Sequence, residues 1–423
     1  MQIKKKIAII GLGYVGLPLA LAFSKKFKVL GYDISKTRVI NLQNGFDKNN
    51  EFKKNSLLKN KNLTLTFNDD DLSSKDVFII TAPTPLKKGN LPDLKPLISA
   101  VRIVAKKMKK NSTIIIETTV YPGVTEEVCI PIIEKFSKFK LNKSFFCAYS
   151  PERINPGDKK RTLENIKKIV SASNQKTLKR VSRLYGTIIK AGIYEAKSIK
   201  VAEAAKVIEN TQRDLNIALI NELSFLFSKL NIETKDVLDA ASTKWNFLKF
   251  QPGLVGGHCV SVDPYYLTFK SKKAGYNPKI ILSGRNVNNY VAKFIFEKTK
   301  ELMKKKKILV KKSKVLIAGF AFKNDCSDCR NTKVFDIYKN FKKYVDTIDI
   351  FDPHVNSRDV YKEYKLKMIN QPKKNFYDIL ILAVDHKSFK QKNIKYFKNF
   401  LKSKSIIFDI KNIYPTENSD LRL

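Results

Sequence analysis

Short apolar runs alternate with segments of helical periodicity over roughly the first half of the chain. The apolar runs predict buried strands at residues 7–10, 28–32, 77–81, 113–117, 145–149 and 168–172. Strands that alternate with helices are typical of a parallel, doubly wound sheet. We therefore expect this part of the chain to form an α/β domain.

The pattern changes between residues 200 and 230, where apolar residues recur at helical spacing and no proline interrupts them. This spacing predicts one long helix that joins two domains and packs against a second subunit. Two further helices are predicted, at 234–241 and 280–302. Ile208 is expected to face inward. The recurring apolar positions are Val201, Ile208, Leu215, Leu219, Leu223, Leu226 and Leu230.

A second alternating region begins near residue 314, with predicted strands at 315–319, 347–351, 379–384 and 406–410. It lacks a dinucleotide glycine fingerprint, so it should bind something other than a dinucleotide. The predicted fold class is therefore α/β, with two Rossmann-like doubly wound sheets joined by a long central helix. The predicted domains are 1–198, 199–305 and 306–423.

A glycine motif follows the first predicted strand directly. Gly11, Gly13 and Gly16 form G-x-G-x-x-G before a predicted helix, and Asp33 ends the next strand. Such glycines let the backbone approach a pyrophosphate, and the acid suits a ribose 2′-hydroxyl. The motif predicts NAD as cofactor, although Arg38 leaves NADP open; the alternative is a packing turn, which would not need the acid.

Two further segments fall at the carboxyl edge of the predicted sheet. Residues 82–85 and 118–122 each follow a strand, and open α/β sheets bind ligands at this edge. Thr81, Pro83 and Thr119 are accordingly expected on the cofactor side.

Charge and cysteine content limit the partners. The formal charge of +42 would suit nucleic acid or a membrane surface. The lysines are spread through nearly every segment, however, so we interpret the charge as a compositional bias and expect neither partner. Five cysteines, few and odd in number, fit free thiols in the cytoplasm. The basic and apolar start imitates a secretory signal, but cleavage there would discard the glycine motif, and no other run is long enough to span a bilayer.

The most reactive candidate is Cys259, which follows Gly256, Gly257 and His258. Glycines before a cysteine let a ligand approach the thiol. Asp263 would lie near the thiol in one helical turn and could orient a water. The alternative is a buried cysteine acting as a small hydrophobe.

Other candidates for chemistry lie on the long helix and after a strand. Lys206 and Asn210 share a helix face and could hold a developing oxyanion, or form an exposed polar pair. Glu152 follows a strand and could exchange a proton, or it could form a salt bridge or cap a helix. His258, His354 and His386 show no metal-type spacing, and Cys326 and Cys329 lack a second ligand pair, so no metal site is expected.

Taken together, these motifs resemble the UDP-sugar 6-dehydrogenases of the UDP-glucose/UDP-mannose dehydrogenase family over nearly the whole chain. The matching segments are residues 11–16, 118–120, 150–157, 256–263 and 319–323, together with Lys206, Asn210 and Arg330. The resemblance implies an NAD-binding sheet, a central helical dimerisation segment and a C-terminal sheet for UDP. It also implies oxidation of a sugar C6 alcohol to a carboxylate with two NAD.

The resemblance implies a role for each site residue. Cys259 would be the nucleophile, Lys206 and Asn210 would stabilise the oxyanion, Glu152 would be the acid/base, and Asp263 and Thr119 would place water. The implied cofactor contacts are Gly11, Gly13, Tyr14, Val15, Gly16, Asp33, Arg38, Thr81, Pro83, Thr119 and Arg330. The implied substrate contacts are Glu152, Arg153, Lys206, Asn210, Lys244, Phe250, Gly253, Gly256, Phe322 and Lys323. Lys244 would reach the substrate of a neighbouring subunit in a homodimer or larger homo-oligomer.

The motif wording favours a UDP-N-acetylhexosamine as substrate. Plain UDP-glucose enzymes usually carry Gly-Gly-Ser-Cys-Phe, where this chain has His258 and Val260. UDP-N-acetylglucosamine or its galactosamine or mannosamine epimer is expected, for bacterial surface polysaccharide, with UDP-glucose as the alternative. Two other hypotheses stay open: a two-electron hydroxyacid dehydrogenase, which needs no thiol, and an NAD-dependent binding protein without turnover.

Overall fold

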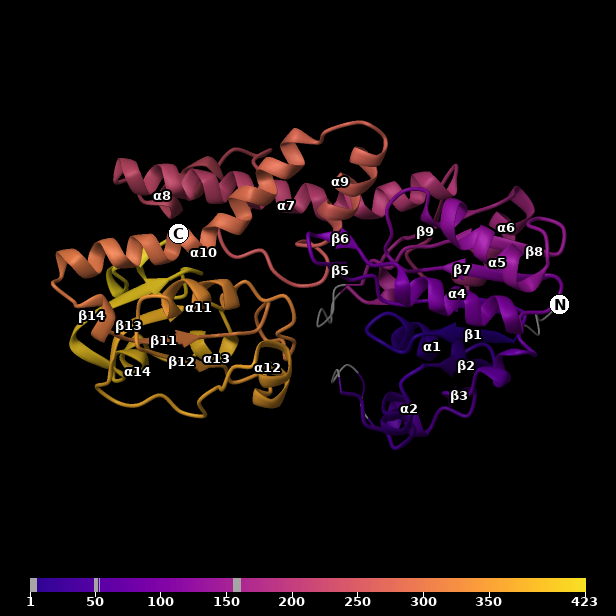
Figure 1. Ribbon diagram of the computed structural model, residues 1–423, viewed down its shortest axis with the longest axis horizontal. Helices are drawn as coiled ribbons and strands as arrows, with labels where there is room; N and C mark the ends of the chain where they lie inside the picture. Colours follow the sequence, from indigo (N-terminus) through magenta and orange to yellow (C-terminus); the bar gives the residue numbers. More distant parts are fainter. Residues whose placement is uncertain (1–5, 49–51, 53, 155–160) are drawn as a thin grey trace. The chain divides into compact units, whose positions relative to one another are not determined.

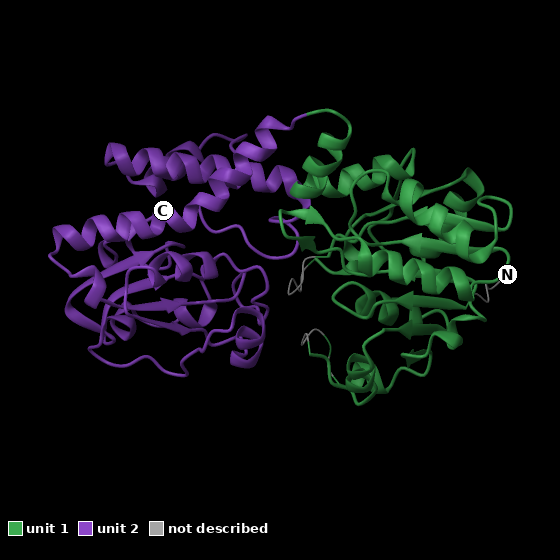
Figure 2. Ribbon diagram, in the orientation of Figure 1, with its two compact units in different colours: residues 1–209, 265–276 green, residues 210–264, 277–423 purple. Residues whose placement is uncertain are grey.

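The computed structural model describes residues 6–48, 52, 54–154 and 161–423. Two compact units divide the chain, and Figure 2 colours them separately. Unit 1 comprises residues 1–209 and 265–276, and unit 2 comprises 210–264 and 277–423. The boundary falls inside the long helix α7 (Ile199–Leu230), which therefore contributes residues to both units.

Unit 1 is built on one large sheet (Figure 1), with strand order β10-β9-β8-β7-β4-β1-β2-β3. The strands are β1 (Ile7–Ile10), β2 (Val29–Tyr32), β3 (Leu63–Thr66), β4 (Val77–Ile80), β7 (Ser112–Ile116), β8 (Phe145–Tyr149), β9 (Lys168–Ala172) and β10 (Ile193–Glu195). Its core order, 3-2-1-4 and onward, is that of a dinucleotide-binding sheet. The predicted strands and doubly wound class are confirmed, whereas β3 and β10 were not predicted because both are short and only partly buried.

One strand pair departs from the expected parallel sheet. β9 pairs antiparallel with β8. The described residues between these strands hold no α-helix. A parallel neighbour is usually reached through a helical crossover, and the antiparallel direction of β9 agrees with a connection that shows no α-helix in its described part.

The helices of unit 1 cover a continuous apolar sheet. All four residues of β1 are buried, as expected for a central parallel strand. Buried apolar residues of the first and the last of these helices pack with residues of the sheet in one hydrophobic cluster. These helices are α1 (Gly16–Ser24), α2 (Lys36–Gln43), α3 (Lys54–Leu58), α4 (Lys95–Lys107), α5 (Ile130–Ser137) and α6 (Gln175–Gly186), and a small hairpin joins β5 (Leu86–Lys87) to β6 (Leu91–Pro92).

Unit 2 carries a second, wholly parallel sheet of order β12-β11-β13-β14-β15. Its strands are β11 (Lys314–Ala318), β12 (Thr347–Phe351), β13 (Tyr377–Leu382), β14 (Leu401–Asp409) and β15 (Leu421–Arg422). The order 2-1-3-4-5 is the other common doubly wound order, with its switch point between the first and third strands. The second α/β sheet predicted from sequence is therefore confirmed.

Long helices lead into the second sheet. After α7 come α8 (Thr234–Ala241), α9 (Asp263–Lys273) and α10 (Lys279–Lys305). The helices of the sheet itself are α11 (Val334–Lys342), α12 (Ser357–Tyr364), α13 (Lys387–Lys390) and α14 (Ile394–Lys398). The predicted long helix and α8 are confirmed, and α10 extends slightly beyond its predicted ends.

Several apolar positions of α7 face outward, among them Ile208, which was expected to face inward. Ile208 and Leu219 are 51% and 54% exposed, and Leu226 and Leu230 are similarly exposed. The helix instead buries a stripe of polar residues, among them Glu203, Asp214 and Asn221. Periodicity located the apolar stripe but could not tell an inward face from an exposed one.

Among the residues that the structure describes, no helix combines the length and the apolar character that a membrane crossing requires.

Candidate active site

The glycine loop of unit 1 leaves room for a ligand above its backbone. Gly11 has a φ of +97°, and a Cβ on Gly16 would lie 1.8 Å from the carbonyl oxygen of Gly11. By contrast, a Cβ on Gly13 would meet nothing within 4 Å. Helix α1 begins at Gly16 without a side-chain cap, so its first N–H groups are available to an anion. The loop therefore fits a pyrophosphate, as its sequence predicts.

Asp33 and Arg38 hold the glycine loop through hydrogen bonds. One Asp33 oxygen accepts the Leu12 N–H at 2.8 Å, and the other accepts the Ser35 N–H at 2.8 Å. Arg38 donates to the Leu12 carbonyl at 3.0 Å and pairs with Asp47 at 2.8 Å. Arg38 thus has bonds within the protein, and a carboxylate at the ribose position suits the free 2′-hydroxyl of NAD.

Threonines tie the ends of neighbouring strands to the loop. The Thr81 hydroxyl donates to the Gly11 carbonyl at 2.8 Å. The Thr84 hydroxyl donates to the Thr119 carbonyl at 2.7 Å, which joins the segments after β4 and β7. Thr81, Pro83 and Thr119 therefore lie at the carboxyl edge of the sheet, as predicted. Tyr14 and Val15 lie between the second and third glycines of the loop.

Glu152 is a buried carboxylate directly after β8, 7% exposed. One oxygen accepts the N–H groups of Arg153 at 2.6 Å and Ile154 at 2.5 Å. The Arg153 guanidinium bonds elsewhere, to the Lys167 carbonyl at 2.9 Å and Glu209 at 2.8 Å. Glu152 therefore does not cap a helix, but the alternative of a salt bridge is confirmed, since Lys168 Nζ lies 3.6 Å from Glu152 Oε2. Residues 155–157 of the motif 150–157 lie outside the described residues.

Cys259 lies in a turn of unit 2 and is exposed. Its carbonyl accepts the Asp263 N–H at 2.8 Å, which completes the predicted helical turn before α9. Asp263 is buried, and its carboxylate accepts a 2.6 Å hydrogen bond from the Asn210 side chain. The alternative that Cys259 is a buried small hydrophobe is therefore wrong, and Asn210 and Asp263 are brought together beside its turn.

Lys206 and Asn210 are buried, not an exposed polar pair. They lie one turn apart on α7, and only 8% of Lys206 and 6% of Asn210 are exposed. Ile208 between them is exposed, so the pair lies on the inner, polar face of the helix.

The turn that carries Cys259 is supported by the loop after β11. A Cβ on Gly257 would lie 2.7 Å from the Phe322 ring, so glycine is needed for this close approach. His258 pairs with Asp328 at 3.0 Å, and Asp328 also pairs with Arg330 at 2.6 Å. Burial opposes ionisation of Asp328, but the bonds from His258 and Arg330 prevail and hold its pKa well below the usual range. Sequence analysis missed Asp328 and did not predict this pairing for Arg330.

A buried amide holds the start of the same loop. Asn221 of α7 accepts the Gly253 N–H at 2.7 Å and donates to the Gly253 carbonyl at 3.0 Å. Asn221 also donates to Asn288 at 2.8 Å, and Asn288 in turn donates to Asp214 at 2.7 Å. This buried network anchors the loop between Gly253 and Cys259 to two long helices.

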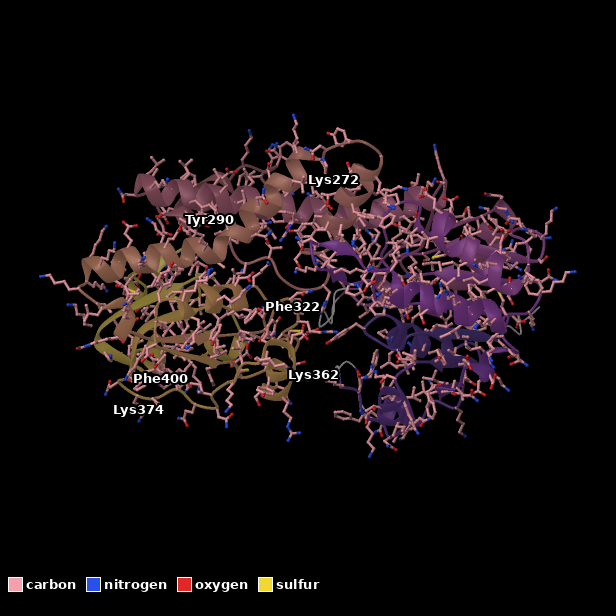
Figure 3. The ribbon with its side chains drawn as sticks, in the orientation of Figure 1. Lys272, Tyr290, Phe322, Lys362, Lys374 and Phe400 are labelled. Carbon is pink, nitrogen blue, oxygen red and sulfur yellow. The ribbon has the colours of Figure 1, made fainter. Side chains whose placement is uncertain are left out.

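A pocket lies at the carboxyl edge of the second sheet, at its switch point. Its walls come from the segments after β11, β13 and β14, from the 254–256 loop and from the start of α11; they include Leu254, Gly256, Phe322, Lys323, Val334, Val384 and Lys411. Phe322 is labelled in Figure 3. Burial lowers the pKa of Lys411, although Asp385 opposes the shift. Three lysines, at 323, 333 and 411, and the N-terminus of α11 outweigh Asp385 in the lining, so the pocket suits an anionic ligand such as a diphosphate.

Lys411 was missed as a binding residue, although its sequence position contained the signal. It directly follows a buried strand, at the edge where ligands bind. The other predicted pocket residues, Gly253, Gly256, Phe322 and Lys323, do lie at or beside the pocket. Lys244 lies away from it in a surface segment, next to Trp245, which is 92% exposed. Phe250 is partly buried.

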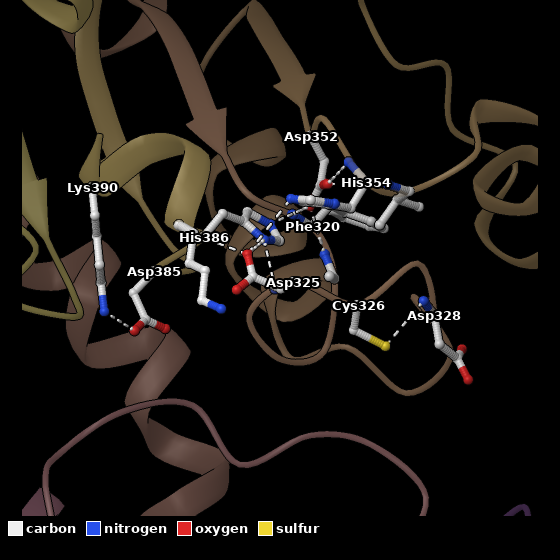
Figure 4. A network of polar contacts seen from close by, with 12 residues as sticks. Phe320, Asp325, Cys326, Asp328, Asp352, His354, Asp385, His386 and Lys390 are labelled. Carbon is white, nitrogen blue, oxygen red and sulfur yellow. Dashed lines mark hydrogen bonds and ion pairs between the residues drawn. The ribbon is translucent and has the colours of Figure 1, made fainter. Parts of the chain in front are cut away.

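Two of the histidines, read from sequence as separate, are neighbours (Figure 4). Their rings are 4.6 Å apart, because His354 and His386 follow β12 and β13 at one sheet edge. Together with Asp325 they offer ligand atoms within 4.8 Å of one another. However, His386 Nδ1 accepts the Asp325 N–H at 3.0 Å, and its Nε2 donates to Asp352 at 3.1 Å. Because both ring nitrogens are used, His386 acts as a structural bridge and offers no lone pair to a metal.

Lysines are spread over both units, as the sequence predicts. Those labelled in Figure 3 are Lys272 of α9, Lys362 of α12 and Lys374, which lies between α12 and β13.

Comparison with known proteins gives matches along the chain. Sequence models of the UDP-glucose/GDP-mannose dehydrogenase family match in three parts: the NAD binding domain at 5–189, the central domain at 200–290 and the UDP binding domain at 316–416. The family description names GDP-mannose, where sequence analysis had UDP-mannose.

Individual relatives match over nearly their full length. The chain is 49% identical to a UDP-N-acetyl-D-glucosamine 6-dehydrogenase of Salmonella typhi, over 99% of this chain and 98% of that protein. It is 48% identical to a protein of the same description from Pseudomonas aeruginosa, over 99% of each chain. A solved UDP-D-ManNAc dehydrogenase structure from Pyrococcus horikoshii superposes with a TM-score of 0.89, at 29% identity, over 97% of this chain and 96% of that one.

Proposed function

Because the chain belongs to the UDP-glucose/GDP-mannose dehydrogenase family, we propose that this NAD-dependent oxidoreductase oxidises the C6 alcohol of a UDP-N-acetylhexosamine to the uronic acid. UDP-N-acetylglucosamine is the proposed substrate, since two relatives near 49% identity carry that name. The observation that carries the proposal is the exposed Cys259 in unit 2, whose turn also packs against the loop that lines the anion pocket.

The proposed reaction uses the thiol as a covalent handle. NAD, when bound, accepts one hydride from each of two successive oxidations. The C6 alcohol first becomes an aldehyde, and the Cys259 thiol adds to it to give a thiohemiacetal. Loss of the second hydride gives a thioester, and water then cleaves the carbon–sulfur bond to release the carboxylate and restore the thiol. One sugar therefore yields two NADH.

Other residues of this chain would support these steps. Lys206 and Asn210 would stabilise the developing oxyanion, and Glu152 would exchange the proton. Asp263, held by Asn210 at 2.6 Å, would orient water, and Thr119 would help to place it. Lys323 and Lys411 would bind the diphosphate of the substrate.

The exposed face of α7 supports a homodimer. Leu219, Leu226 and Leu230 form an apolar stripe of a kind that soluble proteins usually cover. A second copy of the chain would bury this stripe, and Lys244 could then reach the partner's substrate. We place the dimer in the cytoplasm, since no disulfide links the five cysteines, all of which are described. Its product would serve surface polysaccharide synthesis.

The test is NADH formation with UDP-N-acetylglucosamine, its galactosamine and mannosamine epimers, and UDP-glucose. Two NADH per sugar, with the highest kcat/KM for UDP-N-acetylglucosamine, are expected. Cys259→Ala should form no acid product, whereas Cys326→Ala, the other cysteine that is not buried, should act like wild type. One NADH per sugar with a stable aldehyde would refute the four-electron route. Full activity after thiol alkylation would favour the hydroxyacid dehydrogenase.

A further inference from the structure

Two buried carboxylates share one buried ammonium behind the proposed acid/base. Glu117 follows β7, Glu152 follows β8 and Lys168 begins β9, so three adjacent strands supply them. Lys168 and Glu117 are 2% and 1% exposed. The Lys168 ammonium forms a short ion pair with Glu117 and lies 3.6 Å from Glu152 Oε2.

The two carboxylates are held unequally. The second oxygen of Glu117 accepts a 2.5 Å hydrogen bond from the buried Tyr185 hydroxyl, so both its oxygens are engaged. Glu152 Oε1 accepts two backbone N–H groups, whereas Oε2 has no hydrogen-bond partner among the described residues. Glu152 Oε2 is therefore the oxygen placed to take up a proton.

The charge balance makes this group sensitive to pH. Two carboxylates and one ammonium leave one excess negative charge away from water, which is unfavourable unless a proton is bound. Burial raises the pKa of Glu117 to about 7, against the pull of Lys168 and with a further rise from Glu152. Burial opposes the charge on Lys168, but the two carboxylates prevail and raise its pKa. Lys168 therefore remains charged, and Glu117 is the group of this cluster that titrates near neutral pH.

We propose that Glu117 and Lys168 are positioning residues for Glu152, and that proton binding at Glu117 controls how closely the shared Lys168 ammonium is held by Glu152. The inference rests on the proposed function, in which Glu152 exchanges a proton with the substrate. While Glu117 is ionised, it holds the Lys168 ammonium closely and competes with Glu152 for it. Once Glu117 is protonated, the ammonium is left to Glu152 Oε2.

The other groups around Glu117 and Glu152 do not compensate the negative charge of these two carboxylates. Tyr185 is a neutral donor to Glu117, and its ring lies 5.2 Å from the Lys168 ammonium. The Arg153 guanidinium is paired with Glu209. Among the described residues, Lys168 is thus the charged side chain that contacts both Glu117 and Glu152.

The experiment is the pH profile of kcat/KM for wild type, Glu117→Gln and Lys168→Met with UDP-N-acetylglucosamine. Glu117→Gln removes the group whose pKa lies near 7, so the acidic limb in that range should be lost from the profile. Lys168→Met removes the cation that lowers the pKa of Glu117, so the limb should move to higher pH by about one unit or more. Lys167→Met, an exposed neighbour, is the matched control and should not move it.

The outcomes separate this inference from the proposed function. No turnover by wild type with any of the UDP-sugars would refute the proposed function. Turnover with an acidic limb that survives in Glu152→Gln would refute the inference alone. A limb that stays in place in folded Glu117→Gln, while only the melting temperature falls, would show a merely structural role and also overturn it. Should Lys168→Met fail to fold, Glu117→Gln, which keeps the side-chain shape, decides by itself.

Discussion

Replacing Asn221 by alanine should release the loop that leads to Cys259. The Asn221 side chain makes two hydrogen bonds to the backbone of Gly253, at 2.7 and 3.0 Å, and one to Asn288 at 2.8 Å. Truncation leaves an N–H, a carbonyl and an amide oxygen without this partner, in a buried site. An unsatisfied buried polar group is unfavourable by about 1–3 kcal/mol. Because water can enter the vacated space and satisfy part of this set, we expect a net loss of roughly 3 kcal/mol of unfolding free energy.

Two measurements test this expectation. Urea unfolding followed by circular dichroism gives the stability change, and hydrogen exchange of residues 253–257 shows whether the loss is centred on the loop. Asn216→Ala is the matched control, since Asn216 lies on the same helix and bonds only within it, to the Gln212 carbonyl at 2.8 Å. The control should change stability by less than about 0.5 kcal/mol. If Asn221→Ala behaves like the control in both measurements, the hydrogen bonds of Asn221 do not hold the loop in place.

Three further outcomes are expected. Gly16→Ala places a Cβ 1.8 Å from the Gly11 carbonyl oxygen, so NAD affinity measured by calorimetry should fall at least about tenfold. Gly13→Ala, whose Cβ would meet nothing within 4 Å, should keep the wild-type melting temperature. Equal NAD affinity in Gly16→Ala and wild type would contradict the loop geometry. Burial raises the pKa of Glu203 from its ordinary 4.5 to about 7, against the backbone bonds that it accepts. Its contribution to stability is therefore full below pH 4.5 and is lost as pH rises through 7. Glu203→Gln should reduce the fall of the unfolding free energy between pH 5 and 7, measured in urea, by up to about 1.4 kcal/mol per pH unit. An unchanged slope of unfolding free energy against pH would refute this expectation. Leu226→Glu should shift the protein toward monomer in light scattering, and an unaltered mass would argue against the α7 interface.

Sequence patterns predicted the fold well where burial is continuous. The all-apolar strand β1 and the uninterrupted helix α7 left little ambiguity in element type. The antiparallel β9 was not foreseen, because its direction depends on the connection between strands and not on its own residues. The orientation of Ile208 on α7 was predicted wrongly for a related reason, since an apolar position is equally suited to a core and to an interface.

The candidate site was predictable where a residue type limits the chemistry. The glycine loop and Cys259 follow from local sequence, because close approach and thiol reactivity each need one residue type. Glu117 and Lys168 were missed as site residues because a charged residue at a strand end is normally expected to be exposed to solvent. Their partnership is set by three strands that meet in space, and only the fold brings them together.

The outward apolar face of α7 also bears on how stability should be measured. A surface of this kind, when covered by an identical chain, makes folding and association one equilibrium. The unfolding midpoint should then rise with protein concentration, and dilution alone should weaken the protein. Comparisons between variants are meaningful only at equal concentration.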